Sequence, residues 1–233
     1  MTDDGTTEAG MTEAGGVRLA YRAWGQPGAP PLILLHGLGE GAADWVGVAP
    51  AFAPHYRVYA IDLRGHGASD WPGAYSVELM GADVLAFLDA RHLDQVDMIG
   101  HSMGGLVACL VARQRPERVR ALVLEDIGVI EPRPAEALAR PAGDLPYDWA
   151  MVLAIRGQID NPDPAWWDGL KRVTAATLII GGGPASHIPQ DRVAELARRI
   201  PGARLETIPA GHLVHAAEPA AFTDLALAFL RPG

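Results

Sequence analysis

The residues best suited to chemistry occupy positions 100–104, Gly-His-Ser-Met-Gly, which match the pattern G-x-S-x-G. An apolar run over residues 96–99 precedes this motif, and a pattern of helical period follows it. A turn this tight holds the serine in a strained conformation, and glycines two residues before and after it avoid collisions with neighbouring backbone. The hydroxyl then lies at the positive end of a helix, where a developing oxyanion is stabilised. We interpret Ser102 as a nucleophile, against the alternative of a glycine-rich turn that happens to contain a serine.

The composition predicts a globular protein of one domain with a small insertion. Hydrophobic residues make up 49% of the 233, and no run approaches the roughly 20 apolar residues of a membrane span. The net charge of -9 argues against nucleic acid and anionic membranes as partners. The single cysteine excludes an internal disulfide, and the first residues show neither a basic start nor an apolar stretch. We therefore expect a cytoplasmic protein, and nothing in the sequence indicates its oligomeric state.

The elements that must position Ser102 follow an alternating pattern of strands and helices. Residues 1–15 contain two near-copies of Thr-Glu-Ala-Gly with few apolar side chains, which predicts a disordered tail. Beyond it, strands are predicted at residues 31–35, 56–61, 96–99, 121–124 and 177–180. The runs at 31–35 and 121–124 are continuously apolar, which is typical of strands buried in the sheet. This alternation predicts an α/β protein with a mostly parallel, doubly wound sheet. Residues 127–175, rich in Pro, Ala and charge, predict a small helical cap inserted into a core of residues 16–126 and 176–233.

The polar residues that follow these strands are expected to meet in space. In an open parallel sheet, reactive groups gather beyond the carboxyl ends of the strands. Five candidate residues lie there by this interpretation: His36, Ser102, Glu125, Asp126 and His212. Their coincidence at one edge of the sheet is stronger evidence for a site than any single motif.

With these residues in view, the chain resembles the α/β-hydrolase fold family from residue 17 onward. The matching segments are His36-Gly37, residues 62–70, residues 100–105 and Gly211-His212, in the order and at the spacing typical of the family. The resemblance implies an eight-stranded sheet and a Ser–acid–His triad that hydrolyses ester-like bonds. It is highly specific for the fold and carries little information about the substrate.

The base and the oxyanion hole are assigned from position. A serine hydroxyl needs a base within hydrogen-bonding reach. His212 follows the last predicted strand and Gly211, and the resemblance favours it over His215, three residues later. The oxyanion hole should consist of the backbone N–H groups of Met103, directly after the nucleophile, and of Leu38.

The acid of the triad departs from the commoner pattern. The family usually carries it in the loop after the seventh strand, here residues 181–189, which contain no carboxylate. Some members, such as the haloalkane dehalogenases, carry it after the sixth strand, which here ends in Glu125-Asp126. Because adjacent residues of a strand point opposite ways, only one of these two can reach His212. We favour Asp126 and keep Glu125 and Asp191 as alternatives, although Asp191 is suited to capping the next helix.

The substrate pocket is less well defined by the sequence. Trp149, Trp166 and Trp167 in the predicted cap could line an apolar acyl pocket, or could serve only to pack the insertion. His36 is expected near the site. No pair of histidines has the i, i+4 spacing of a helical zinc site with a glutamate between them, so we expect neither a metal nor another cofactor.

These features predict a serine hydrolase that cleaves a small carboxylic ester, thioester or lactone through an acyl-enzyme on Ser102. One alternative is a C–C bond hydrolase or lyase on the same scaffold. The other is a non-catalytic protein that holds a small ligand in the same cleft, which the unusual position of the acid keeps open.

Overall fold

The computed structural model describes residues 8–134 and 137–231, and within them one sheet forms the centre of the molecule. Its eight strands run in the order β1-β2-β4-β3-β5-β6-β7-β8. β1 and β2 pair antiparallel with their neighbours, whereas all pairings from β4 to β8 are parallel. The strands are β1 (Glu8–Ala14), β2 (Val17–Trp24), β3 (Pro31–Leu35), β4 (Arg57–Ile61), β5 (Val96–His101), β6 (Val119–Glu125), β7 (Ala176–Gly181) and β8 (Arg204–Thr207). The predicted mostly parallel, eight-stranded α/β sheet is thereby confirmed.

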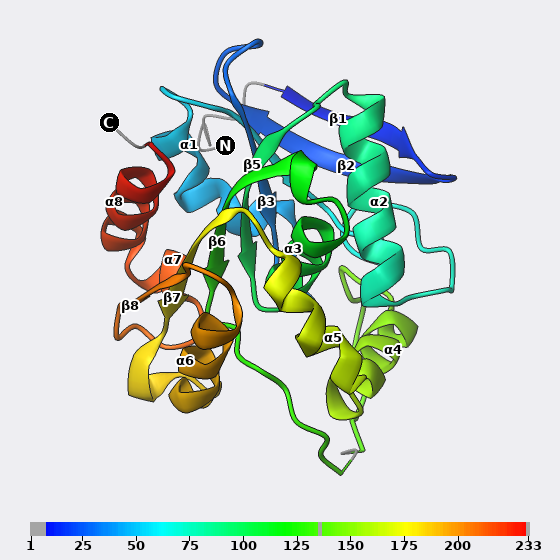
Figure 1. Cartoon of the computed structure of the whole chain (residues 1–233). Helices are drawn as coiled ribbons and strands as arrows, with labels where there is room; N and C mark the ends of the chain where they lie inside the picture. Colours follow the sequence, from blue (N-terminus) through cyan, green and yellow to red (C-terminus); the bar gives the residue numbers. More distant parts are fainter. Residues whose placement is uncertain (1–7, 135–136, 232–233) are drawn as a thin grey trace.

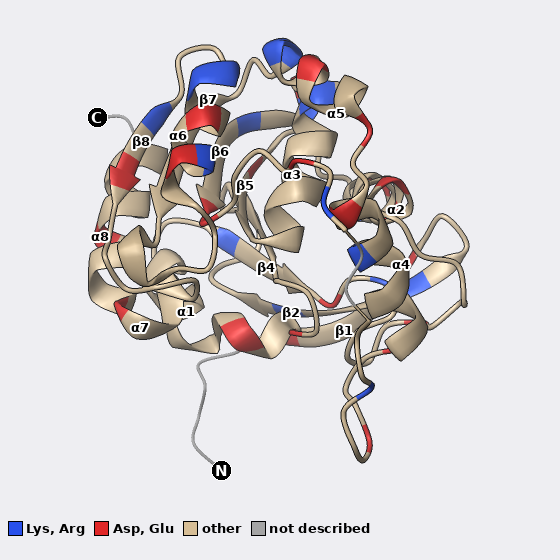
Figure 2. Cartoon of the chain, turned by 90° about the horizontal axis from the view of Figure 1, so that it is seen from below, with Lys and Arg blue, Asp and Glu red and all other residues tan. Residues whose placement is uncertain are grey.

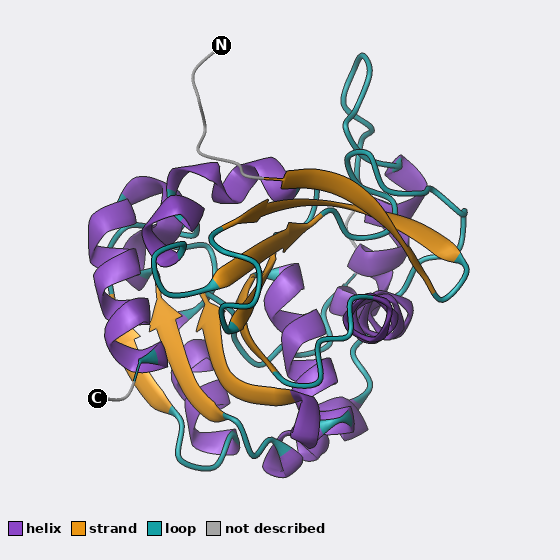
Figure 3. Ribbon diagram, turned by 90° about the horizontal axis from the view of Figure 1, so that it is seen from above, coloured by secondary structure: helices purple, strands orange, loops and turns teal. Residues whose placement is uncertain are grey.

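Helices cover both faces of this sheet, as the views in Figures 1 and 3 show. The α-helices are α1 (Ala49–Phe52), α2 (Val77–Ala90), α3 (Met103–Gln114), α4 (Trp149–Asp160), α5 (Pro164–Asp168), α6 (Gln190–Arg199), α7 (Val214–Ala217) and α8 (Pro219–Leu230). The short 3₁₀ turns are η1 (Ala42–Gly47), η2 (Pro116–Arg118), η3 (Gly169–Arg172) and η4 (Gly183–Ala185). Among the described residues, none of these helices combines the length and the apolar character that crossing a bilayer would need.

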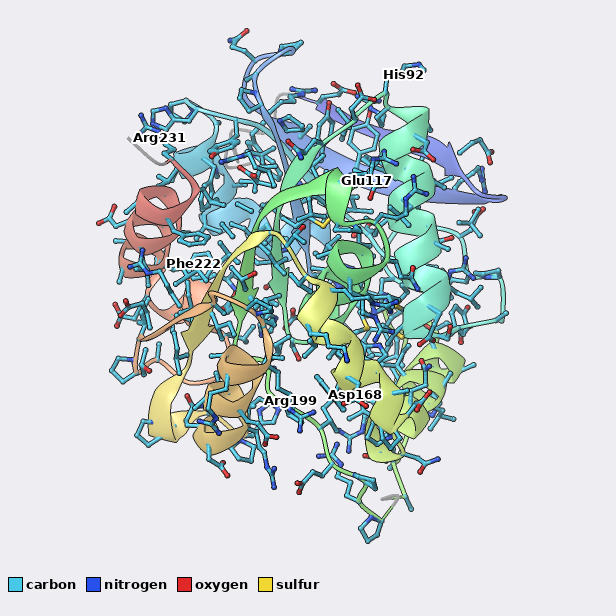
Figure 4. The ribbon with its side chains drawn as sticks, viewed as in Figure 1. His92, Glu117, Asp168, Arg199, Phe222 and Arg231 are labelled. Carbon is cyan, nitrogen blue, oxygen red and sulfur yellow. The ribbon has the colours of Figure 1, made fainter. Side chains whose placement is uncertain are left out.

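The core has two layers because the side chains of each strand alternate between the faces of the sheet. In β3, Ile33 and Leu35 pack in the layer that contains α2 and α3, and Leu32 and Leu34 pack in the layer of α1 and α8. Phe222, labelled in Figure 4, is fully buried in the second layer, with its ring centroid 6.4 Å from that of Trp45. Both faces of the central strands are thus buried, which explains their continuous apolar sequences.

The predicted disordered tail at residues 1–15 is wrong for the part that the structure describes. Residues 8–14 form β1, an edge strand paired along its whole length with β2 across a turn at Gly15 and Gly16. Both glycines have positive φ angles, 63° and 91°, as a tight hairpin turn requires. The strand buries only small side chains, those of Thr12 and Ala14, so its polar composition concealed it. Residues 1–7 lie outside the described part of the chain.

Between β6 and β7 the chain leaves the sheet and forms α4, α5 and η3 before it returns. Figure 1 shows these elements beyond the end of the sheet at which β6 finishes. Buried side chains of this segment, including Met151, Ile155 and Leu170, belong to the same core layer as α2 and α3. The division of the chain into a core and a cap of residues 127–175 stays a prediction.

Candidate active site

Ser102 lies at a sharp turn between β5, which ends at His101, and α3, which begins at Met103. Its backbone has φ 50° and ψ -115°, a conformation that non-glycine residues rarely adopt. The two flanking glycines are required by the close approach of backbone. A Cβ atom on Gly100 would lie 2.5 Å from the Gly104 oxygen, and one on Gly104 would lie 2.2 Å from the Leu35 oxygen. The steric reason for the G-x-S-x-G spacing is therefore visible in the turn itself.

The imidazole of His212 is held by Asp126, which directly follows β6. Nδ1 of His212 lies 2.7 Å from Oδ2 of Asp126. The Asp126 side chain is fully buried, and that of His212 is 21% exposed. Because a buried carboxylate beside Nδ1 favours the tautomer with its proton on that nitrogen, Nε2 is left available as a proton acceptor. Within residues 8–134 and 137–231, Nε2 makes no hydrogen bond.

Asp126 is fixed by donors from the loop after β7. The Gly182 N–H donates to Oδ1 at 2.8 Å, and the Ser186 hydroxyl donates to Oδ2. Burial alone would raise the pKa of the Asp126 carboxyl, but the hydrogen bonds from His212, Ser186 and Gly182 outweigh it and lower that pKa below its usual range. Asp126 is therefore ionised at neutral pH and oriented toward the imidazole.

The two alternative acids lie elsewhere. Glu125 is fully buried, and its carboxylate accepts hydrogen bonds from the backbone N–H of His215 at 2.8 Å and from the His215 ring. The Asp191 side chain is 77% exposed on α6 and lies 3.9 Å from Arg192. Of the three carboxylates that the sequence suggested, Asp126 is the one in contact with His212.

A cavity of about 560 Å³ opens at these residues. Ser102, His212 and Asp126 line it together with Leu38 and Met103, the two residues predicted to form an oxyanion hole. In the described part of the chain, neither the Leu38 nor the Met103 backbone N–H donates a hydrogen bond to protein. The apolar walls of the cavity are formed by Leu106, Ile127, Val129, Ile130, Ile159 and Ile188. The cavity can therefore receive a group with an apolar body and a carbonyl oxygen.

The remaining residues predicted to line the pocket are not found there. His36 is fully buried, where its Nε2 accepts the Leu63 N–H at 3.0 Å and desolvation lowers its pKa to about 4. Trp149 packs against the core and lines neither the cavity at Ser102 nor the smaller cavity beside it. Trp166 and Trp167 line a neighbouring cavity of about 160 Å³, which shares wall residues such as Ile130 and Ile159 with the larger one. The predicted pocket roles of His36 and Trp149 are corrected because both side chains serve the packing of loops and helices.

A second acid–histidine cluster, absent from the sequence-based predictions, lies beside the first. Nδ1 of His215 is 2.8 Å from Glu125 Oε2, and its Nε2 is 2.9 Å from Asp44 Oδ2. Burial would lower the pKa of His215, but the two carboxylates raise it to about 10, so the ring is an imidazolium at neutral pH. The Trp45 ring stacks on it with centroids 4.4 Å apart.

His101 connects the two clusters. Its Nδ1 lies 3.2 Å from Glu40 Oε2, and its Nε2 lies 3.0 Å from the backbone oxygen of His212. Ligand atoms of Asp44, His101 and His215 lie within 4.8 Å of one another, close enough to be considered as metal ligands. Both nitrogens of His215 already face carboxylates, so hydrogen bonding accounts for this group without an ion. His101 occupies the variable position before Ser102 in the G-x-S-x-G motif, and this position could have indicated that its side chain lies near the site.

Comparisons with known proteins agree with this fold. The family model for the alpha/beta hydrolase fold matches residues 30–171, more than half of the chain. A putative esterase/lipase of Haemophilus influenzae is 30% identical over 82% of this chain and 79% of its own length. The sn-1-specific diacylglycerol lipase ABHD11 of Mus musculus is 26% identical over 86% of this chain and 81% of its own length. Several other curated relatives match over only about a third of their own length.

A solved structure supports the fold over nearly the whole chain. The enol-lactonase from Burkholderia xenovorans LB400 superposes with a TM-score of 0.80, covering 95% of this chain and 99% of that protein. Its sequence identity is 22%, so the likeness concerns the fold alone. The names of the relatives describe hydrolases of esters, lipids and lactones on one scaffold.

Proposed function

Because the chain belongs to the α/β-hydrolase fold family, we propose that it is a serine hydrolase acting on a small carboxylic ester, thioester or lactone. The observation that carries this proposal is the cavity that Ser102 and His212 line together. Nδ1 of His212 is held by the buried carboxylate of Asp126, which leaves Nε2 for the reaction. A non-catalytic binding site would not require a strained serine and an oriented imidazole in one cavity.

In the proposed reaction, Nε2 of His212 takes the proton of the Ser102 hydroxyl as Oγ attacks the ester carbonyl carbon. The electron pair of the C=O bond moves to the oxygen, which the Leu38 and Met103 N–H groups stabilise. Collapse of this intermediate breaks the bond to the leaving group, which receives the proton from His212. Water then attacks the acyl-enzyme with His212 again as base, and the acid is released with Ser102 restored.

Covalent labelling tests the nucleophile separately from the substrate. We expect a fluorophosphonate probe to modify the wild type and not Ser102→Ala, because the probe needs an activated serine. Ser76→Ala is the matched control, since Ser76 caps α2 outside the cavity and its loss should leave labelling intact. Absence of labelling in the wild type would contradict the proposal and favour a binding protein. Labelling without turnover of any ester would favour a C–C bond hydrolase or lyase.

We further propose that residues 127–175 act as a small cap that limits substrate size. The cavity that Ser102 lines is also lined by four residues of this segment, Ile127, Ile130, Arg156 and Ile159. The insertion therefore forms part of the wall of the proposed substrate cavity. A cavity of about 560 Å³ accommodates a short acyl chain better than a long one. A series of p-nitrophenyl esters should therefore show kcat/KM falling with acyl length, and equal turnover of long-chain esters would contradict this.

A further inference from the structure

Three arginines line the cavity that contains Ser102, and they differ in how well their charges are compensated. Arg192 of α6 donates hydrogen bonds to two carboxylates, from Nη2 to Glu131 Oε2 at 2.5 Å and from Nη1 to Glu195 Oε2 at 3.0 Å, and Asp191 Oδ2 lies 3.9 Å from its Nε. Its charge is therefore neutralised by the protein itself. Figure 2 shows residues of both signs on α6.

Within residues 8–134 and 137–231, Arg133 and Arg156 form ion pairs with the same carboxylate and no other, that of Asp160 at the end of α4. Nε of Arg133 lies 2.6 Å from Oδ1 of Asp160, whereas Nη2 of Arg156 lies 3.8 Å from the same oxygen. The Asp160 side chain is 8% exposed and the Arg156 side chain 26% exposed. Among the described residues, two guanidinium groups against one carboxylate leave a local excess of positive charge at this part of the cavity wall, whereas Glu40 and Asp126 line it elsewhere.

Arg156 also has a donor that the protein does not use. In the described part of the chain, its Nε is buried without a hydrogen-bond partner. A buried donor left unpaired is costly, and a guanidinium is suited to bind a carboxylate through two parallel N–H···O bonds. Because Nε is enclosed by protein atoms, an anion in the cavity would act on the exposed part of the Arg156 side chain and compensate the excess charge there.

We propose that Arg156, with Arg133, binds a carboxylate carried by the substrate, so that the preferred substrates are esters with an anionic end. This inference rests on the proposed serine hydrolase function, whose substrate class it narrows. Leu106, Ile130 and Ile159 line the same cavity and would contact an apolar spacer between the ester and the carboxylate. The carboxylate can belong to the acyl part or to the alcohol part of the ester.

Paired substrates of equal length test this charge preference. On the acyl side, the mono-p-nitrophenyl ester of adipic acid is compared with p-nitrophenyl hexanoate. On the alcohol side, the acetyl ester of ω-hydroxyhexanoate is compared with hexyl acetate. For the wild type we expect kcat/KM to be about tenfold higher for the anionic member of at least one pair, mainly through KM.

Arg156→Gln should abolish this ratio, and Arg156→Lys should restore part of it, because an ammonium retains the charge but loses the bidentate geometry. Arg192→Gln is the matched control: it removes an arginine of the same cavity that already has two carboxylate partners, so the ratio should change less than about twofold. A wild type that hydrolyses both members of each pair equally, or a preference that survives Arg156→Gln, would overturn the inference. Failure to hydrolyse any of the esters would instead count against the proposed function.

Discussion

Two acid–histidine pairs lie next to each other in this protein, and their members are also close together in the sequence. Asp126 pairs with His212, and the preceding residue Glu125 pairs with His215. His212 lines the cavity with only Nδ1 bonded to a carboxylate, whereas His215 is buried with carboxylates at both nitrogens. The same two residue types therefore produce a group open to substrate in one case and a closed ion cluster in the other.

The difference shows what an imidazole needs to act as a base. A base must present an unprotonated nitrogen to the reacting group and titrate near the working pH. His215, with its pKa raised to about 10, stays protonated at neutral pH and has no nitrogen left for a substrate. Its charge instead compensates the fully buried carboxylate of Glu125, which would otherwise be costly to bury, and the partly buried carboxylate of Asp44.

The largest expected effect distinguishes the two histidines. We expect His212→Gln to lower kcat on a p-nitrophenyl ester by about 10⁴-fold, because it removes the proposed base. Ser102→Ala with His212→Gln should be little worse than either change alone, since the two act as a unit. His215→Gln, corrected for the folded fraction, should lower kcat by less than about tenfold. If His215→Gln is as damaging as His212→Gln, the assigned roles of the two histidines are wrong.

The second prediction compares the acids. Asp126→Asn should lower kcat by roughly 10³- to 10⁴-fold, because the amide favours the wrong tautomer of His212 and does not stabilise the imidazolium. Glu125→Gln and Asp191→Asn should each stay within about tenfold of the wild type. All three values are measured on one ester. If Asp191→Asn has the largest effect on kcat, the acid of the triad lies in the region after β7 and the assignment of Asp126 is wrong.

The third prediction concerns stability, for which we expect Glu125 to matter much more than Asp191. Glu125→Gln removes one partner of a buried ion cluster and should lower the free energy of unfolding by about 3 kcal/mol. Asp191→Asn, at an exposed position on α6, should change it by less than about 0.5 kcal/mol. Urea denaturation followed by far-UV circular dichroism measures both. Equal stabilities of the two variants would show that the Glu125–His215 pair contributes little.

The fourth prediction concerns the pH dependence of stability at the second pair. The pKa of His215 is raised from 6.5 to about 10 on folding, so its contribution is fully present below pH 6.5 and is lost as the pH rises through about 10. The difference in unfolding free energy between the wild type and His215→Gln should therefore narrow between pH 7 and pH 10. A difference that does not change with pH would mean that the imidazole is neutral in the folded protein.

Local sequence patterns were sufficient to predict much of the fold and the turn at Ser102. Burial on both faces makes a central strand apolar throughout, and backbone contact excludes any side chain at Gly100 and Gly104. These requirements act over a few residues, so they are visible in the sequence. The edge strand β1 was missed because it buries only small side chains, which leave the composition polar.

The tertiary structure alone determined which charged side chains pair when they are far apart along the chain. The sequence suggested that one of Glu125 and Asp126 would reach His212, since neighbours on a strand point opposite ways. Which of them does so depends on the loop after β7, whose Gly182 N–H and Ser186 hydroxyl hold Asp126 in place. The sequence likewise did not predict that Arg133 and Arg156 share the Asp160 carboxylate, because this contact depends on how α4 meets the chain that leaves β6. Periodicity and turn sterics are local, whereas the pairing of charges depends on which loops the folded sheet brings together.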